Sequence, residues 1–241
     1  MSKDYICILL MCLTSLNISA QNYIFTWEGS NSGIKAVWTV NDTSNVYYIP
    51  ELNMNVKVSI IDPYGQNTTE ANMSDFGDYT RTNTFFGSGN LALQATSANS
   101  GQSVCLKFEF EKPVYLRDFK IYDIDMKQDG SWAPNTFQDS IMVTANRNGV
   151  NAPLFINHMS SSPSYTIYGQ TVSANLIPGM DGDVDYNDLN GAISVSSSSP
   201  LTEFALYYSN GSQDDGISNS HAIKIPGFDI ELFQSPLPVK I

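Results

Sequence analysis

The sequence predicts an all-β fold, an antiparallel β-sandwich or jelly roll formed by a single domain. Three observations indicate this fold. Short runs rich in Val, Ile, Tyr and Phe alternate apolar and polar residues, as strands with one buried face do. Gly, Asn, Asp, Ser and Pro separate these runs, which is typical of turns between strands. No stretch sustains an apolar stripe with a period of about 3.6 residues, so we expect no long helix.

The alternation places the strands one after another along the chain. Two long connections, 62–89 and 125–138, interrupt them, and ordered long loops often carry function. The expected strands are 23–27, 35–41, 45–49, 56–61, 90–96, 103–110, 114–124, 140–147, 153–156, 165–167, 171–174, 191–196, 202–208 and 221–232.

The first twenty residues have the features of a signal peptide. Lys3 precedes the apolar stretch 6–13, and Ile-Ser-Ala at 18–20 forms a cleavage site before Gln21. The apolar stretch is shorter than the roughly 20 residues that a membrane-spanning helix needs. We therefore expect a signal peptide at 1–20, a β-sandwich domain at 21–232 and a linker-like tail at 233–241. The mature chain would be secreted or displayed at the cell surface, without inserting into a membrane.

The charge balance restricts the partners. The chain has 12 basic and 24 acidic residues, a net charge of −12, and losing Lys3 and Asp4 with the leader leaves that balance unchanged. Such a chain is repelled by phosphate backbones and by anionic lipid. We therefore expect no nucleic-acid partner.

The cysteines exclude an intrachain disulfide in the mature protein. Of the three, Cys7 and Cys12 lie in the leader, so Cys105 remains alone. An exported domain of this kind must be held together by its core and by any metal that it binds. Cys105 lies in an alternating run, where we expect a buried, small apolar residue rather than a catalytic thiol.

Three aspartates are the strongest candidates for a site. Asp123 and Asp125 continue the face of the apolar residues that precede them, and Asp139 shares the face of Ile141. If strands 114–124 and 140–147 pair as an antiparallel hairpin, the three carboxylates meet at one end of the sandwich.

Three chemical roles remain open for this cluster. Carboxylate oxygens suit Ca²⁺, so a structural calcium site at Asp123, Asp125 and Asp139 is one interpretation. The same side chains could instead cap the loop 125–138 through bonds to its backbone. A pair of carboxylates about 5–10 Å apart could also hydrolyse a glycoside, which would involve Asp123 and Asp139.

Trp132 is the candidate ligand-binding residue. It lies within the connection 125–138, where it has less reason to join the core than Trp27 or Trp38 in their strands. An exposed indole on a loop can stack on the apolar face of a sugar ring. The alternative is that Trp132 folds back and plugs the end of the sandwich.

Two segments resemble known groups of proteins. The run Leu237-Pro238-Val239 resembles the start of the segment that joins cargo domains to the C-terminal sorting domain in Bacteroidetes type IX secretion substrates. That resemblance implies a piece of a longer secreted protein. The pattern of 119–125, 138–143, 222–225 and 228–230 resembles bacterial surface β-sandwich domains, which are similar to adhesin modules and non-catalytic carbohydrate-binding modules.

Together these observations favour an exported, non-catalytic binding or adhesive domain. Neither His158 nor His221 has the spacing of a metalloprotease site, and no Gly-x-Ser-x-Gly elbow occurs. The expected partner is an extracellular glycan or a surface protein. The alternatives are a polysaccharide hydrolase that uses the carboxylates near Asp123 and Asp139, and a structural subunit of an extracellular assembly.

We predict that the mature protein begins at Gln21 and is soluble without its leader, because the cleavage site follows a short apolar stretch. Intact-mass measurement of protein recovered from the medium or the periplasm tests this. A mass that retains residues 1–20 would contradict the assigned compartment.

Overall fold

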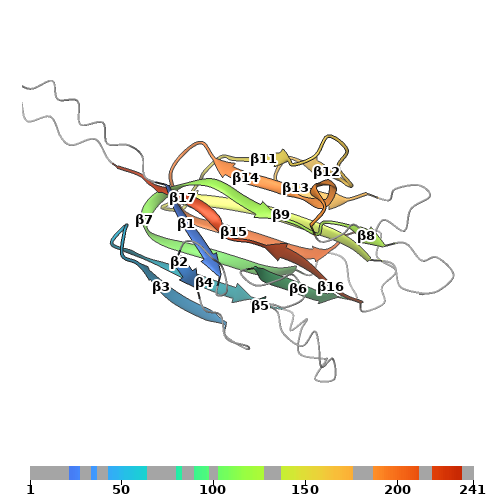
Figure 1. Cartoon of the computed structure of the whole chain (residues 1–241), viewed down its shortest axis with the longest axis horizontal. Helices are drawn as coiled ribbons and strands as arrows, with labels where there is room; N and C mark the ends of the chain where they lie inside the picture. Colours follow the sequence, from blue (N-terminus) through green and yellow to red (C-terminus); the bar gives the residue numbers. More distant parts are fainter. Residues whose placement is uncertain are drawn as a thin grey trace, which may run out of the picture.

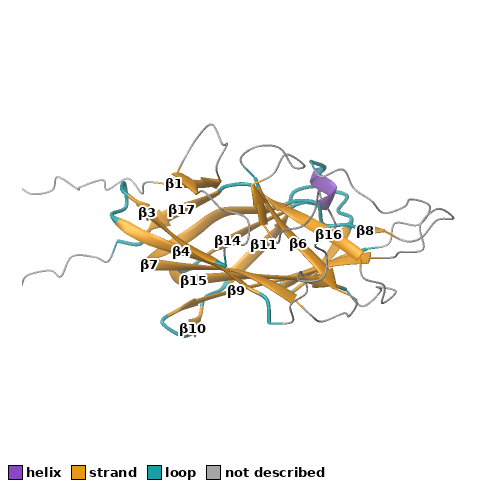
Figure 2. Cartoon of the chain, turned by 90° about the horizontal axis from the view of Figure 1, so that it is seen from below, coloured by secondary structure: helices purple, strands orange, loops and turns teal. Residues whose placement is uncertain are grey.

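The structure is an all-β sandwich, as the sequence predicts, and its strands are almost all antiparallel. The exception is a short parallel pair between β1 and β2. One 3-10 turn, η1 (Leu189–Gly191), lies between strands and is purple in Figure 2. This computed structural model describes residues 22–27, 34–36, 43–63, 80–82, 90–97, 103–127, 137–175, 187–211 and 219–234.

Seventeen strands are found within the described residues. In chain order they are β1 (Asn22–Trp27), β2 (Ile34–Ala36), β3 (Ser44–Ile49), β4 (Met54–Ile61), β5 (Thr80–Thr82), β6 (Leu91–Ser97), β7 (Ser103–Ile121), β8 (Met126–Lys127), β9 (Phe137–Arg147), β10 (Val150–Asn151), β11 (Leu154–His158), β12 (Tyr165–Tyr168), β13 (Thr171–Ala174), β14 (Ile193–Ser197), β15 (Leu201–Asn210), β16 (Asn219–Ile225) and β17 (Phe228–Leu232).

The longest strand, β7, contributes to both layers of the sandwich. Its first half pairs with β4 and β15, and its second half pairs with β17 and β14. Between the halves the register with β15 shifts, and Pro113, which has no N–H to donate, lies at this point. Figure 1 shows β7 curving back on itself at one end of the molecule.

The two layers follow from these pairings. The first layer has the strand order β3-β4-β7-β15-β9-β13-β12, and the second has the order β11-β14-β7-β17-β1-β2. A smaller sheet, β16-β6-β5, joins the second layer where Tyr122 and Lys224 exchange two backbone hydrogen bonds of 2.9 and 3.0 Å. Figure 1 shows β16 and β6 side by side.

Aromatic side chains from both layers meet in the core. Phe108 and Phe204 of the first layer pack against Phe119 and Phe228 of the second. The ring centroids are 5.7 Å apart for Phe108–Phe119, 5.0 Å for Phe108–Phe228 and 4.7 Å for Phe119–Phe204. All four side chains are almost completely buried, and such contacts contribute about 0.5–1.5 kcal/mol each beyond area burial. The bend in β7 thus brings its own two halves together across the core.

The structure corrects three details of the predicted elements. The expected strands 103–110 and 114–124 form one bent strand, and the expected strand 221–232 is two strands, because Pro226 and Gly227 interrupt it. A Cβ on Gly227 would come within 2.4 Å of the Phe25 carbonyl oxygen, so the close approach requires glycine. A short strand, β5, lies within the expected connection 62–89.

Several predictions concern residues outside the described ranges. The signal peptide at 1–20, most of the tail at 233–241, and Trp132 are among them. None of the helical structure in the described ranges is long and apolar enough to cross a membrane.

Candidate functional site

Asp125 and Asp139 lie together at one end of the sandwich. The Asp139 amide donates to the Asp125 carbonyl oxygen at 2.9 Å, and the Asp125 amide donates to Asp139 Oδ2 at 3.0 Å. Asp125 is 5% exposed and Asp139 is 1% exposed. These reciprocal bonds join the start of β8 to β9, as a carboxylate that caps a loop does.

Tyr208 of β15 completes the buried group. Its hydroxyl donates to Asp139 Oδ1 at 2.7 Å. Burial raises the pKa of Tyr208 well above its ordinary value, and the negative charges of Asp139, Asp125 and Asp123 raise it further. The phenol therefore stays neutral, and it remains a hydrogen-bond donor to Asp139.

The route by which the aspartates meet differs from the expected one. The second half of β7 and β9 belong to different layers and do not pair; the antiparallel pair at this end is β8 with β9. Asp123 has a φ of +67°, which ends the strand alternation before Asp125. Asp123 is consequently only partly buried, whereas Asp125 and Asp139 are buried.

This geometry supports the loop-capping interpretation. Both Asp139 oxygens accept hydrogen bonds from protein groups, and the side chain does not reach the surface. A hydrolytic carboxylate must contact substrate, so Asp139 is poorly placed for the hydrolase alternative. Across the described ranges, no three acidic, His or Cys side chains are grouped as metal ligands. Calcium binding by Asp123, Asp125 and Asp139 stays a prediction.

Cys105 is buried, as predicted. Burial raises the pKa of its thiol to about 11, so at neutral pH it is protonated and a weak nucleophile. Trp132 lies outside the described residues, so a ligand surface must be sought elsewhere among them.

The outer face of the first layer carries an apolar row that sequence reasoning missed. Its members are directly paired from strand to strand across six strands. Tyr168 is 68% exposed, Ile61 45% and Met142 41%, Tyr207 and Thr171 are partly exposed, and Cys105, at 4% exposure, is the one buried member. The row consists of Ile61, Cys105, Tyr207, Met142, Thr171 and Tyr168.

A row of hydroxyl side chains runs beside the apolar row. Each member is two residues from a member of the apolar row on the same strand, so it lies on the same face. All five are partly exposed, and they are also paired from strand to strand. The row consists of Ser103, Ser209, Ser140, Ser173 and Thr166.

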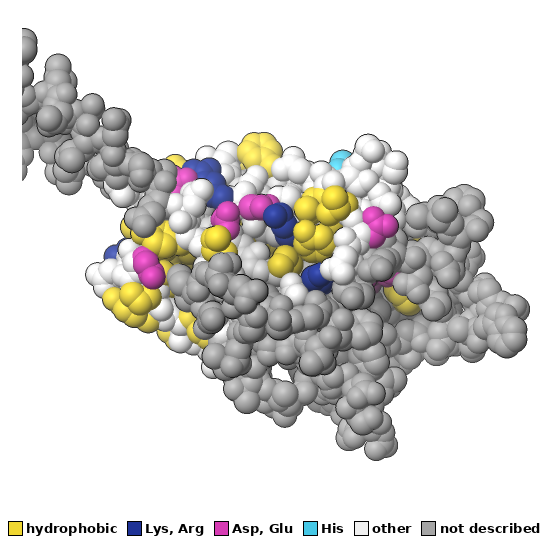
Figure 3. All heavy atoms as spheres, in the orientation of Figure 1, with side chains coloured by type: hydrophobic (Ala, Val, Ile, Leu, Met, Phe, Trp, Pro, Cys, Tyr) yellow, Lys and Arg dark blue, Asp and Glu magenta, His cyan; other side chains and the backbone are white. Residues whose placement is uncertain are grey.

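Ion pairs lie on the other side of the apolar row. Lys107 is 2.8 Å from Glu203 and 3.6 Å from Glu109, and Lys57 is 3.1 Å from Glu109. The Lys57 contact lowers the pKa of Glu109, and the Glu203 contact raises the pKa of Lys107. The charges of this group therefore balance locally. The opposite signs are also mixed on the molecular face shown in Figure 3.

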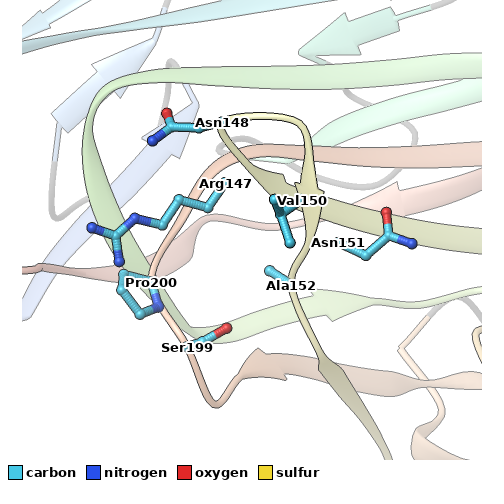
Figure 4. A pocket seen from close by; sticks show the side chains of 7 residues that line it. All are labelled: Arg147, Asn148, Val150, Asn151, Ala152, Ser199 and Pro200. Carbon is cyan, nitrogen blue, oxygen red and sulfur yellow. The ribbon is translucent and has the colours of Figure 1, made fainter.

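A separate hollow of about 340 Å³ lies between the β9–β10 turn and the segment before β15. Figure 4 shows Val150, Ala152 and Pro200 beside it, with Arg147 extending along one wall. The Arg147 guanidinium is 4.8 Å from the centroid of the Phe233 ring. Arg147, Asn148, Asn151 and Ser199 complete its lining, and none of the lining residues belongs to the two rows.

Comparisons with protein families, with curated proteins and with solved structures find no match for this chain. The functional argument therefore depends on the geometry of the described residues.

We predict that Asp139→Asn lowers the free energy of unfolding by about 2 kcal/mol. The side-chain NH2 group of asparagine would face either the Asp125 amide or the Tyr208 hydroxyl, both of which are donors, so one buried hydrogen bond is lost. Asp118→Asn is the control: Asp118 pairs with Lys120 at the surface, and asparagine keeps an oxygen that can accept from Ser194, so this substitution should cost at most about 1 kcal/mol. Thermal and urea unfolding measure both. Equal effects would contradict the buried hydrogen-bonding role.

The same unfolding experiment tests the calcium prediction. Bound Ca²⁺ at a hundred times its dissociation constant would add about 2.7 kcal/mol, so a chelator would lower the melting temperature of the wild-type protein. A melting temperature indifferent to chelator and to added calcium would leave only the capping role.

Proposed function

We propose that this chain is an exported, non-catalytic binding domain that holds a glycan on the outer face of its first layer. The observation that carries the proposal is the part of the apolar row that reaches the surface, from Tyr207 through Met142 and Thr171 to Tyr168, lying in register beside the hydroxyl row. The predicted signal peptide and acidic composition fit a partner outside the cell that is not a polyanion.

The chemistry of the two rows matches that of a sugar. A pyranose has apolar C–H faces, which pack on tyrosine rings and aliphatic side chains, and an equatorial rim of hydroxyl groups. The hydroxyl row can both donate to and accept from that rim. A protein partner needs a more apolar centre with large anchors, whereas eight of the eleven side chains in the two rows carry a hydroxyl group.

The ion pairs of the carboxylates nearest to the two rows favour a binding role over hydrolysis. Glu109 and Glu203 are directly paired on neighbouring strands of the same face. A glycosidase needs one carboxyl group with a raised pKa to donate a proton. The pKa of Glu109 is instead lowered by Lys57, and both glutamates form ion pairs with Lys107.

We predict that Tyr168→Ala and Met142→Ala each weaken retention on a glycan by about threefold to tenfold, as expected for one lost packing contact with a sugar face. A glycan array followed by affinity electrophoresis on the retained polysaccharide measures this. Tyr48→Ala is the matched control, because Tyr48 is an exposed tyrosine of β3 on the same face but outside the row.

Two outcomes would contradict the proposal. Retention of no glycan by the wild-type protein would remove it, and an equal loss in Tyr48→Ala would move the site off the row. Release of reducing sugar by the wild-type protein, abolished by Asp139→Asn, would favour the hydrolase.

A further inference from the structure

We propose that the ligand is an extended, uncharged, β-linked polysaccharide whose axis runs across the strands, with one sugar unit over each of β15, β9, β13 and β12. This inference depends on the proposed function and specifies the class of glycan. It is based on the spacing of the rows, on the hydroxyl groups of the second row and on the pairing of Lys57 and Lys107 with glutamates beside the rows.

The spacing of the rows matches the repeat of such a chain. Neighbouring strands lie about 4.8 Å apart, so the apolar row from β4 to β12 extends over roughly 24 Å. An extended β-linked pyranose chain advances by close to one interstrand spacing per sugar. Successive sugars can therefore lie over Tyr207, Met142, Thr171 and Tyr168 on β15, β9, β13 and β12, whereas Cys105 on β7 is buried.

The hydroxyl row gives the chain an orientation. Thr166 exchanges hydrogen bonds with Asn175 at 2.7 and 3.0 Å, which fixes the end of the row at β12. Among the residues that the structure describes, the hydroxyl groups of Ser140, Ser173 and Ser209 have no hydrogen-bond partner in the protein. They are partly exposed and can bond to one edge of the sugar chain while its faces lie over the apolar row.

The charges on this face select against acidic polysaccharides. Lys57 and Lys107 are both held by glutamates, so neither is available to a uronate or a sulfate without breaking an ion pair. The net charge of −12 adds long-range repulsion of a polyanion. An uncharged chain meets neither penalty.

The two tyrosines of the row allow the experiment to distinguish short ligands from long ones. Tyr207 on β15 and Tyr168 on β12 are separated by β9 and β13. A ligand must therefore span four sugar units to contact both rings, and shorter ligands contact one ring only. Affinity should rise steeply when the ligand reaches the tetrasaccharide.

The test is calorimetry of the mature chain with β-1,4-linked glucose, xylose and N-acetylglucosamine oligomers, from disaccharide to hexasaccharide. We expect at least one series to bind about tenfold more tightly at the tetrasaccharide than at the trisaccharide. Tyr168→Ala should remove that step and leave shorter oligomers unchanged, whereas Tyr48→Ala should keep it. Carboxymethylcellulose, an anionic comparator with the same β-1,4 linkage, should bind more weakly than the neutral polymers.

Each failure has a distinct meaning. Binding of a disaccharide as tightly as of a hexasaccharide, or preference for an anionic polymer, would overturn this inference and leave a glycan-binding function. No binding of any glycan would overturn the proposed function as well. Dimerisation that Tyr168→Ala abolishes, without glycan binding, would assign the face to a second copy of the chain.

Discussion

The structure depends on one strand that belongs to two sheets. Because β7 bends at Pro113 and continues into the second layer, the backbone itself connects the layers, and Phe108 and Phe119 of the same strand face each other across the core. The neighbours β4, β15, β14 and β17 all take their register from β7. Cys105, the cysteine among the described residues, is free, so the layers are joined there by the continuous backbone of β7 rather than by a disulfide.

The sequence was sufficient to predict the strands but not their partners. Alternation identified most of the elements, since a strand with one buried face has a period of two. It missed that 103–121 is one strand, because Pro113 resembles a terminator when only local sequence is considered, although a bent strand tolerates it. Strand pairing is non-local, so the placement of the second half of β7 in a different layer from β9 was not predictable from their proximity in the chain.

In the candidate sites, too, local features were predictable from the sequence and contacts between distant segments were not. The juxtaposition of Asp125 and Asp139 was predictable, because the residues on either side of the connection 125–138 were expected at the same end of the sandwich. Their partner Tyr208 lies 69 residues away from Asp139 in the chain, so its hydrogen bond to Asp139 was not predictable. The two surface rows were also missed. Their local signal, a hydroxyl residue two positions from a large or apolar one, recurs in Ser140-x-Met142 and Tyr207-x-Ser209, but only the register reveals that these pairs align.

The buried Asp139 and the two surface rows lie on opposite faces of the same strands. On β9, Asp139 points inward and Ser140 outward; on β15, Tyr208 points inward and Tyr207 outward. A slip of one residue between these strands would exchange their faces and leave Asp139 without the Tyr208 hydroxyl. The hydrogen bond between them therefore penalises the wrong register more than a purely apolar contact would. An interaction inside the sandwich thus specifies which side chains are aligned on its surface, and the proposed binding face requires that alignment.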